Sequence, residues 1–248
     1  PRPVHRLVLP TVWRDGALRQ GSQAKTHETL APLGAQALYG SDADRFGVGV
    51  SPVYGRITDY DVARLHVGWY SDWWYNANPP HPANLDYVQV ISVHHDRYPP
   101  DWNRLAQAIA ANPGALWIIG NEPEGIWQGN RTPAEYARIY GTLYRFIKAR
   151  DATAQVAIGG VIEPTPLRLQ WLDMVMAEYQ TVYGHKMPVD VWNIHVQILR
   201  EKGPWPECPD CWGAGVPVGL TGVTQGRLYS IEDNADPAIF RQLVREFR

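Results

Sequence analysis

Leu116-Trp-Ile-Ile-Gly-Asn-Glu-Pro-Glu124 is an apolar run that breaks at a glycine and ends in an acidic turn. The apolar part, residues 116–119, is too short for a helix and follows Pro113-Gly114, so it predicts a buried strand. Pro123 has no N–H for a sheet ladder and stops the strand there. Catalytic groups of α/β barrels lie at the carboxyl ends of strands, which makes Glu122 a candidate catalytic residue. A tight strand-to-loop turn without catalytic function is the alternative.

The composition indicates a globular chain with a large core and little net charge. Of the 248 residues, 45% are hydrophobic and 19% are charged, which is enough apolar material for one large core. The 23 basic and 25 acidic residues nearly cancel and form no basic stripe, so we expect no nucleic-acid partner. No apolar run reaches the roughly 18–20 residues that span a bilayer, so we expect no membrane partner. We also expect no cofactor.

Short apolar runs alternate with helix-like patterns over residues 46–248, which we interpret as one domain, whereas residues 1–45 are predicted to be an arm or linker. Strands are predicted at 46–50, 65–70, 87–93, 116–119, 156–160 and 189–198. Helices are predicted at 101–112, 132–147, 167–179 and 236–247, and Thr132-Pro-Ala-Glu135 reads as a capping box with proline at the first helical position. This alternation favours an α/β fold with a mainly parallel sheet.

The turn Gly120-Asn121-Glu122-Pro123, placed after a fourth predicted strand, resembles the acid/base signature of the clan A glycoside hydrolases. These are retaining enzymes on the (β/α)8 barrel. The resemblance extends over residues 46–248 through strand order and through Val191-Trp-Asn-Ile-His195 on the sixth strand. It implies a TIM-barrel-like (β/α)8 fold, hydrolysis of a polysaccharide or oligosaccharide, Asn121 on the 2-hydroxyl of the sugar, and Glu122 as the general acid/base.

Two features of that family are missing from the predicted elements. A closed barrel needs eight β/α units, and only six are identifiable here, so a further chain segment completing the barrel is an expected partner. Retaining hydrolysis also needs two carboxyl groups about 5–5.5 Å apart, and the family's nucleophile follows a seventh strand. Glu163, after the fifth predicted strand, is the nearest substitute, although binding substrate or capping its loop is the role we favour for it.

Aromatic residues supply the candidates for sugar stacking. The chain has 11 Trp and 13 Tyr against 4 Phe, and rings with a polar edge suit the half-apolar faces of sugars. The loop after the second predicted strand is predicted to be either a stacking platform or a packed cover of the barrel end, and Trp127 is a second candidate on the same face. The aromatic residues of that loop are Trp69, Tyr70, Trp73, Trp74 and Tyr75.

Polar residues of the sixth predicted strand share one face, because side chains alternate along a strand. His195 and Gln197 on this face would point to the barrel interior or mouth and bind substrate. His94 and His95 follow the third predicted strand, where at most one is expected to reach the site. We favour His95, because it shares the parity of Gln89. Core histidines held by backbone carbonyls are the alternative.

Cys208-Pro-Asp-Cys211 is the only cysteine pair. A structural zinc site needs two further ligands, so a local disulfide is the favoured interpretation, which indicates an extracellular or cell-surface location. The alternative to an enzyme is a non-catalytic carbohydrate-binding protein on a degenerate barrel. A metal-dependent hydrolase using His94, His95 or His195 ranks last, because His-x-His and His-Glu-x-x-His spacings are missing.

Overall fold

The computed structural model describes residues 11–13, 45–203 and 212–247. Its strands are β1 (Thr11–Trp13), β2 (Gly47–Gly49), β3 (Trp69–Ser71), β4 (Asp86–Tyr87), β5 (Gln89–Ile91), β6 (Leu116–Ile119), β7 (Gln155–Ile158) and β8 (Trp192–Ile194). Its α-helices are α1 (Trp102–Ala111), α2 (Pro133–Lys148), α3 (Pro166–Tyr183) and α4 (Pro237–Phe247). Short 3-10 helices are η2 (Pro52–Tyr54), η3 (Ile57–Asp59), η4 (Val62–Leu65), η5 (Pro82–Asn84) and η6 (Glu232–Ala235).

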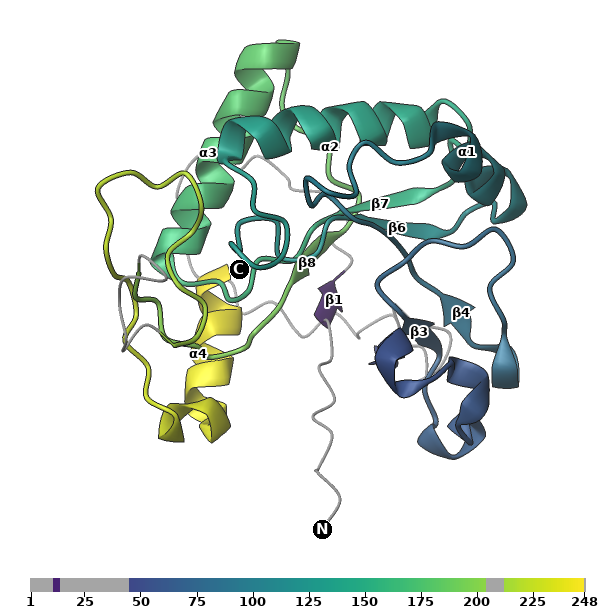
Figure 1. Ribbon diagram of the computed structural model, residues 1–248, viewed down its shortest axis with the longest axis horizontal. Helices are drawn as coiled ribbons and strands as arrows, with labels where there is room; N and C mark the ends of the chain where they lie inside the picture. Colours follow the sequence, from purple (N-terminus) through teal and green to yellow (C-terminus); the bar gives the residue numbers. More distant parts are fainter. Residues whose placement is uncertain (1–10, 14–44, 204–211, 248) are drawn as a thin grey trace, which may run out of the picture.

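The parallel strands lie side by side in the order of the sequence. β2, β3 and β4 form one parallel ladder, and β5, β6 and β7 form another (Figure 1). β4 and β5 follow each other directly, with only Val88 between them. Isolated parallel bridges at Val191 and Ile194 then place β8 beside the β7 segment. The predicted mixed α/β fold with parallel strands is confirmed.

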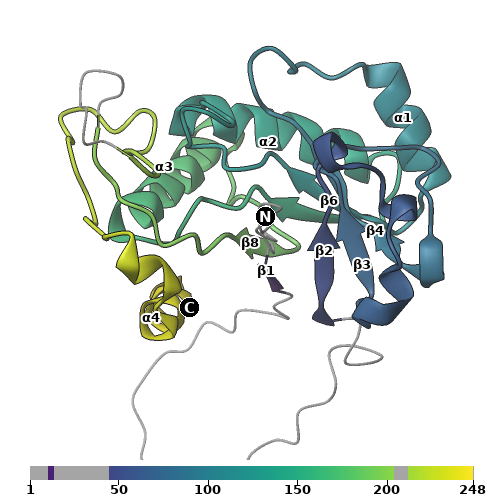
Figure 2. The ribbon, with the colours of Figure 1, turned by 60° about the horizontal axis from the view of Figure 1, so that its bottom comes forward.

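The edge of β8 away from β7 carries an antiparallel partner. β1 pairs there with the register Thr11↔Ile194 and Trp13↔Trp192, and Figure 2 shows the two strands next to each other. The predicted arm therefore contributes a strand to the sheet. In the part of the chain that the structure describes, β2 and β8 do not pair with each other.

Helices α1, α2 and α3 cover one face of the β5–β7 ladder, on the upper side of the sheet in Figure 1. Trp117 and Ile119 point into this helical layer, whereas Ile118 points to the opposite face, as the period of two along a strand requires. The opposite face has a smaller apolar cluster of Val88, Val90, Ile118, Ala157 and Val191. The site described below lies beyond the carboxyl ends of these strands.

The predicted helices are confirmed, and α1 and α2 begin with the caps that the sequence predicts. The Asp101 carboxylate accepts the N–H groups of Asn103 and Arg104 at 2.9 and 3.1 Å at the start of α1. Thr132 and Glu135 form the predicted capping box of α2. A cap of this kind stabilises a helix by about 1 kcal/mol. None of the described helices combines the length and the apolar character needed to cross a bilayer.

Two predicted strands are wrong in extent. Residues 65–68 are not strand, because Leu65 ends η4 and His66 adopts a left-handed conformation with φ of 50°. The sixth predicted strand is regular only at Trp192–Ile194, and beyond it the chain continues through single contacts such as His195 N–H to the Val161 carbonyl at 2.9 Å. Cys208 and Cys211 lie outside the described residues, so the predicted disulfide and the extracellular location stay predictions.

Candidate active site

Glu122 is presented by a tight turn at the carboxyl end of β6. Gly120 has φ of 89° and donates its N–H to the Ile91 carbonyl at 2.8 Å. Glu122 itself has φ of 44°, a left-handed conformation that costs about 1–2 kcal/mol for a residue with a side chain. Its N–H donates to the Gly160 carbonyl at 3.0 Å, which fastens the turn to the segment after β7. Strain of this kind, held by neighbouring backbone, is a feature of functional sites.

The carboxylate of Glu122 is paired with His195. His195 Nδ1 lies 2.8 Å from Glu122 Oε1, and the two side chains are only 6% and 14% exposed. Gly160 makes this approach possible, because a Cβ there would lie 2.8 Å from His195 Cδ2. His195 can donate to an ionised Glu122 or accept from a protonated one, so the pair can hold one proton at the mouth of the sheet.

Two neighbouring cavities surround this turn. The Glu122 chamber, of about 380 Å³, is lined by Glu122, His195, Gln197, Ile162 and Leu199, among others. The His94 chamber, of about 290 Å³, is lined by His94, Asp96, Arg97, Ser92 and Val90, among others. Both chambers share the lining residues Trp73, Asn121, Trp127 and Gln128. They therefore form one groove with Glu122 in the floor of one half.

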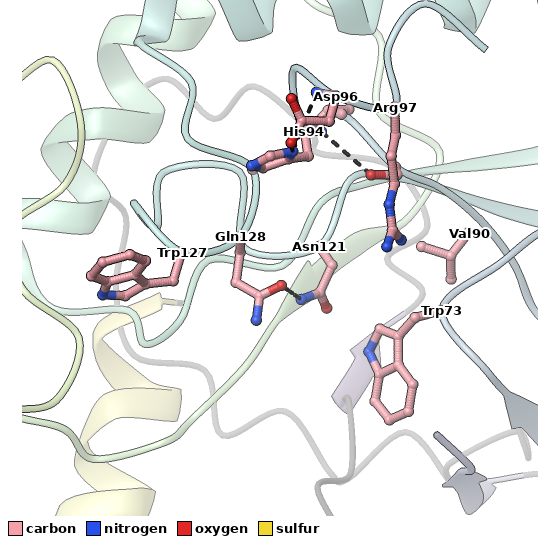
Figure 3. Close-up of a pocket in the computed structure, with 11 residues that line it drawn as sticks. Trp73, Val90, His94, Asp96, Arg97, Asn121, Trp127 and Gln128 are labelled. Atoms are coloured by element: carbon pink, nitrogen blue, oxygen red, sulfur yellow. Dashed lines mark hydrogen bonds and ion pairs between the residues drawn. The ribbon is translucent and has the colours of Figure 1, made fainter. Parts of the chain in front are cut away.

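The boundary between the chambers combines an amide pair with two indole rings. Asn121 Nδ2 donates to Gln128 Oε1 at 3.3 Å, and Figure 3 shows Trp73 and Trp127 on opposite sides of this pair. Trp127 is 71% exposed, so its ring is available to a ligand. Amide groups flanked by aromatic rings can meet both the hydroxyls and the apolar faces of a sugar.

Most of the predicted aromatic platform does not reach the groove. The Trp69 ring lies over Gly47, where a Cβ would be 2.0 Å from the ring. It also packs against the smaller apolar cluster on the face of the sheet opposite the helices. Trp74 stacks on Tyr75 and lies 5.4 Å from the Arg97 guanidinium, outside the lining of both chambers. Trp73 is the member of this loop that lines the groove. The interpretation as a packed cover holds for the others, since their rings pack against neighbouring side chains.

The expectation that His95 would reach the site is corrected. His94 lines a chamber, and His95 does not. The reason is that β5 ends at Ile91 and a turn follows, in which the N–H groups of Arg97 and Tyr98 both donate to the His94 carbonyl at 2.9 Å. Alternation from Gln89 therefore does not extend to these residues.

Glu163 is not placed to act as a nucleophile. Its side chain is fully buried, Oε2 accepts the Leu199 N–H at 2.9 Å, and the residue lines neither chamber. Burial raises the pKa of Glu163 to about 8, although the Arg168 guanidinium opposes the shift. Of the two roles that the sequence analysis favoured over attack, binding substrate is corrected, because the residue lines neither chamber. Capping its loop fits this position, because Leu199 lines the Glu122 chamber.

A buried charged network, which the sequence analysis missed, lies behind the rim. The Arg168 guanidinium of α3 binds Glu124 Oε1 at 3.0 Å and also binds Glu201, and all three side chains are fully buried. Arg168 also donates to the carbonyls of Ala214 and Gly215 at 3.3 and 3.2 Å. The network therefore ties the turn after Glu122 to the rim of its chamber.

Glu163→Gln is expected to remove a pH dependence of stability. The folded-state pKa of about 8 exceeds the ordinary value of 4.5, so between these pH values the folded chain keeps a proton that the unfolded chain has released. Stability then falls as pH rises through this window. Glutamine cannot ionise, so the variant should gain thermal stability over the wild type progressively towards pH 8. Melting curves across the window measure this, and parallel curves for the two proteins would contradict it.

A comparison with protein families matches the part of the chain that contains the groove. A model of the family described as "Glycosyl hydrolase catalytic core" matches residues 53–201, which include Glu122, His195 and both groove tryptophans. The comparison with curated proteins gives no match.

Three solved structures illustrate the fold comparison. An endo-β-1,3-glucanase of GH128 subgroup II from Pseudomonas viridiflava is 21% identical, with 51% of each chain covered and a TM-score of 0.42. One from Sorangium cellulosum is 21% identical, with 53% of this chain and 55% of that chain covered and a TM-score of 0.41. A subgroup I enzyme from Amycolatopsis mediterranei, in complex with laminaritriose, is 17% identical, with 57% and 52% covered and a TM-score of 0.41.

The chain spans about half the length of these solved structures. The family match itself extends over 149 of the 248 residues, from 53 to 201, which is more than half of the chain. The chain therefore belongs to the family of glycosyl hydrolase catalytic cores.

Proposed function

We propose that this protein hydrolyses O-glycosidic bonds of a polysaccharide or oligosaccharide by a retaining mechanism, with Glu122 as the general acid/base. The observation that carries the proposal is the Glu122–His195 pair at 2.8 Å in the floor of an open groove. The carboxylate stands at the carboxyl end of a parallel strand, where barrel enzymes carry their catalytic groups. Membership of the glycosyl hydrolase family supports this chemistry.

In this mechanism each groove residue has a role set by its chemistry. Glu122 gives its proton to the glycosidic oxygen and later takes one from the attacking water. His195 holds the carboxyl group in position through the hydrogen bond to Oε1. Asn121, oriented by Gln128, offers its amide to a sugar hydroxyl, and Trp73 and Trp127 stack on sugar rings.

The proposal requires a second carboxylate opposite Glu122. Among the described residues that line the Glu122 chamber, Glu122 is the one carboxylate. We propose that the nucleophile comes from a further chain segment that completes a (β/α)8 barrel. Such a segment would take the edge of β8 now paired with β1 and cover apolar side chains near β2. The exposed apolar side chains there are Phe46, Val53, Tyr54, Tyr60 and Leu65.

The test is the anomeric configuration of the first product. The protein is incubated with a β-1,3-glucan, with a β-1,4-glucan and with a xylan as separate probes, and fresh reducing ends are followed by proton NMR. A retaining enzyme releases the anomer of the substrate, which mutarotates only later. Initial release of the opposite anomer would disprove the retaining mechanism, and no new reducing ends from any probe would count against hydrolysis.

A second candidate function is carbohydrate binding without turnover. It is favoured by one observation, the combination of a groove flanked by Trp73 and Trp127 with a single carboxylate among the described residues that line the Glu122 chamber. Calorimetric titration with oligosaccharides distinguishes the two functions. Binding without any product, unchanged in Glu122→Gln, would favour the binding protein.

A further inference from the structure

The turn after β5 gathers two imidazoles and a carboxylate beside the groove, and two of these three residues line its His94 chamber. The residues are His94, His95 and Asp96, and one potential ligand atom from each lies within 4.8 Å of the others. His94 Nδ1 is 3.5 Å from Asp96 Oδ2, and His95 Nε2 is 3.4 Å from Asp96 Oδ1. Bonds of about 2.0–2.1 Å to a tetrahedral Zn²⁺ separate neighbouring ligands by about 3.4 Å. Each imidazole therefore has a nitrogen at this separation from one oxygen of the Asp96 carboxylate.

The backbone explains why adjacent histidines lie on the same side. Along a strand they would point to opposite faces, but here the N–H groups of Arg97 and Tyr98 both donate to the His94 carbonyl and wind the chain into a turn. The two imidazole rings lie 4.1 Å apart at 31°. Two imidazoles this close can ligate one cation, and the Asp96 carboxylate can balance its charge.

We propose that His94, His95 and Asp96 bind one divalent transition-metal cation, for which Zn²⁺ is the best match. A donor set of two imidazole nitrogens and one carboxylate oxygen favours zinc, copper or nickel over magnesium and calcium. His95 and Asp96 are 54% and 73% exposed, which leaves an entry path from solvent. His94 Nδ1 accepts the Asp96 N–H at 3.3 Å, a long hydrogen bond that the cation would replace.

The site would face the groove with open coordination positions. His94 and Asp96 line the same chamber as Asn121 and Trp73 (Figure 3). The neighbouring cation, Arg97, is held 5.4 Å from the Trp74 ring. Three protein ligands leave at least one position of a tetrahedral ion free, as in zinc sites that bind substrate. We infer that sugar hydroxyls take this position, and this second half of the inference rests on the proposed function.

The metal itself is tested without any activity assay. Chelator-treated protein is dialysed against ZnCl₂, and bound zinc is counted by elemental analysis and calorimetry. We expect one equivalent for the wild type, loss of that equivalent in His94→Ala and in Asp96→Ala, and full retention in the control His185→Ala, which changes an exposed histidine after α3. Undiminished zinc in His94→Ala would overturn the site and assign the metal to other ligands, such as Cys208 and Cys211.

The glycan half has its own measurement. Oligosaccharide affinity is compared for zinc-loaded and metal-free protein, with a several-fold gain expected on loading and no gain in His94→Ala. Equal affinities would overturn the role in sugar binding while the metal site stands. A protein that binds zinc yet cleaves no glycan would contradict the proposed hydrolysis and leave the metal site intact, so the two failures are distinguishable.

Discussion

Glu122→Gln is expected to lower the rate of glycan hydrolysis by about 100- to 10,000-fold, the usual contribution of a positioned general acid/base. Glutamine has the same size as glutamate and can still form a hydrogen bond with His195, so the 2.8 Å contact between the two side chains can be kept without a charge. It cannot give up a proton to a leaving oxygen. Initial rates of reducing-end release, measured with a matched melting curve, check the effect.

The control for this variant is Glu178→Gln, which makes the same chemical change on helix α3, whose residues line neither chamber. It should leave both the rate and the melting temperature within experimental error of the wild type. If Glu122→Gln retained wild-type activity, the acid/base assignment would be abandoned. A large loss of melting temperature in Glu122→Gln alone would instead show that the residue serves the fold.

Arg168→Met is expected to lower the free energy of unfolding by about 3–5 kcal/mol, because it leaves buried carboxylates without their cation. Glu124 and Glu201 both bind the guanidinium, and both are fully buried. For a domain of this size each kcal/mol lowers the melting temperature by about 2–4 °C. Thermal unfolding should therefore shift down by roughly 6–20 °C.

Two further variants separate charge from packing. Arg138→Met, on the exposed side of α2, removes one arginine without touching the network and should shift the melting temperature by no more than a few degrees. The triple variant Arg168→Met, Glu124→Gln and Glu201→Gln removes the cation together with two carboxylates and should recover part of the loss. An Arg168→Met protein as stable as wild type would show that the buried carboxylates do not need their ion pair.

Two glutamates that are close in the sequence, Glu122 and Glu124, have opposite environments in the structure. Glu122 points into the groove, while Glu124, two residues later, points into the protein and accepts the Ile162 N–H at 2.8 Å. Burial raises the pKa of Glu124, and Arg168 opposes this. Both residues are glutamates, so the sequence alone does not show which of them is buried and which lines the groove.

The sequence by itself determined the local features whose causes are local. The strand over residues 116–119, the stop at Pro123, and the starts of α1 and α2 follow from periodicity and capping, which act within a few residues. The Asn-Glu-Pro turn pointed to a glycosidase, and the family match agrees with that class.

Only the tertiary structure decided which of the candidate side chains meet. Gly160 and His195 approach Glu122 through contacts between segments tens of residues apart. Residues 94 and 95 lie in a turn and not in a strand, so His94 and not His95 lines the groove. Trp69 and Trp74 pack against neighbouring side chains outside the groove, and Arg168 is buried among carboxylates. The physical reason is that burial and long-range contact set the environment of a side chain, and neither is encoded in the spacing of neighbouring residues.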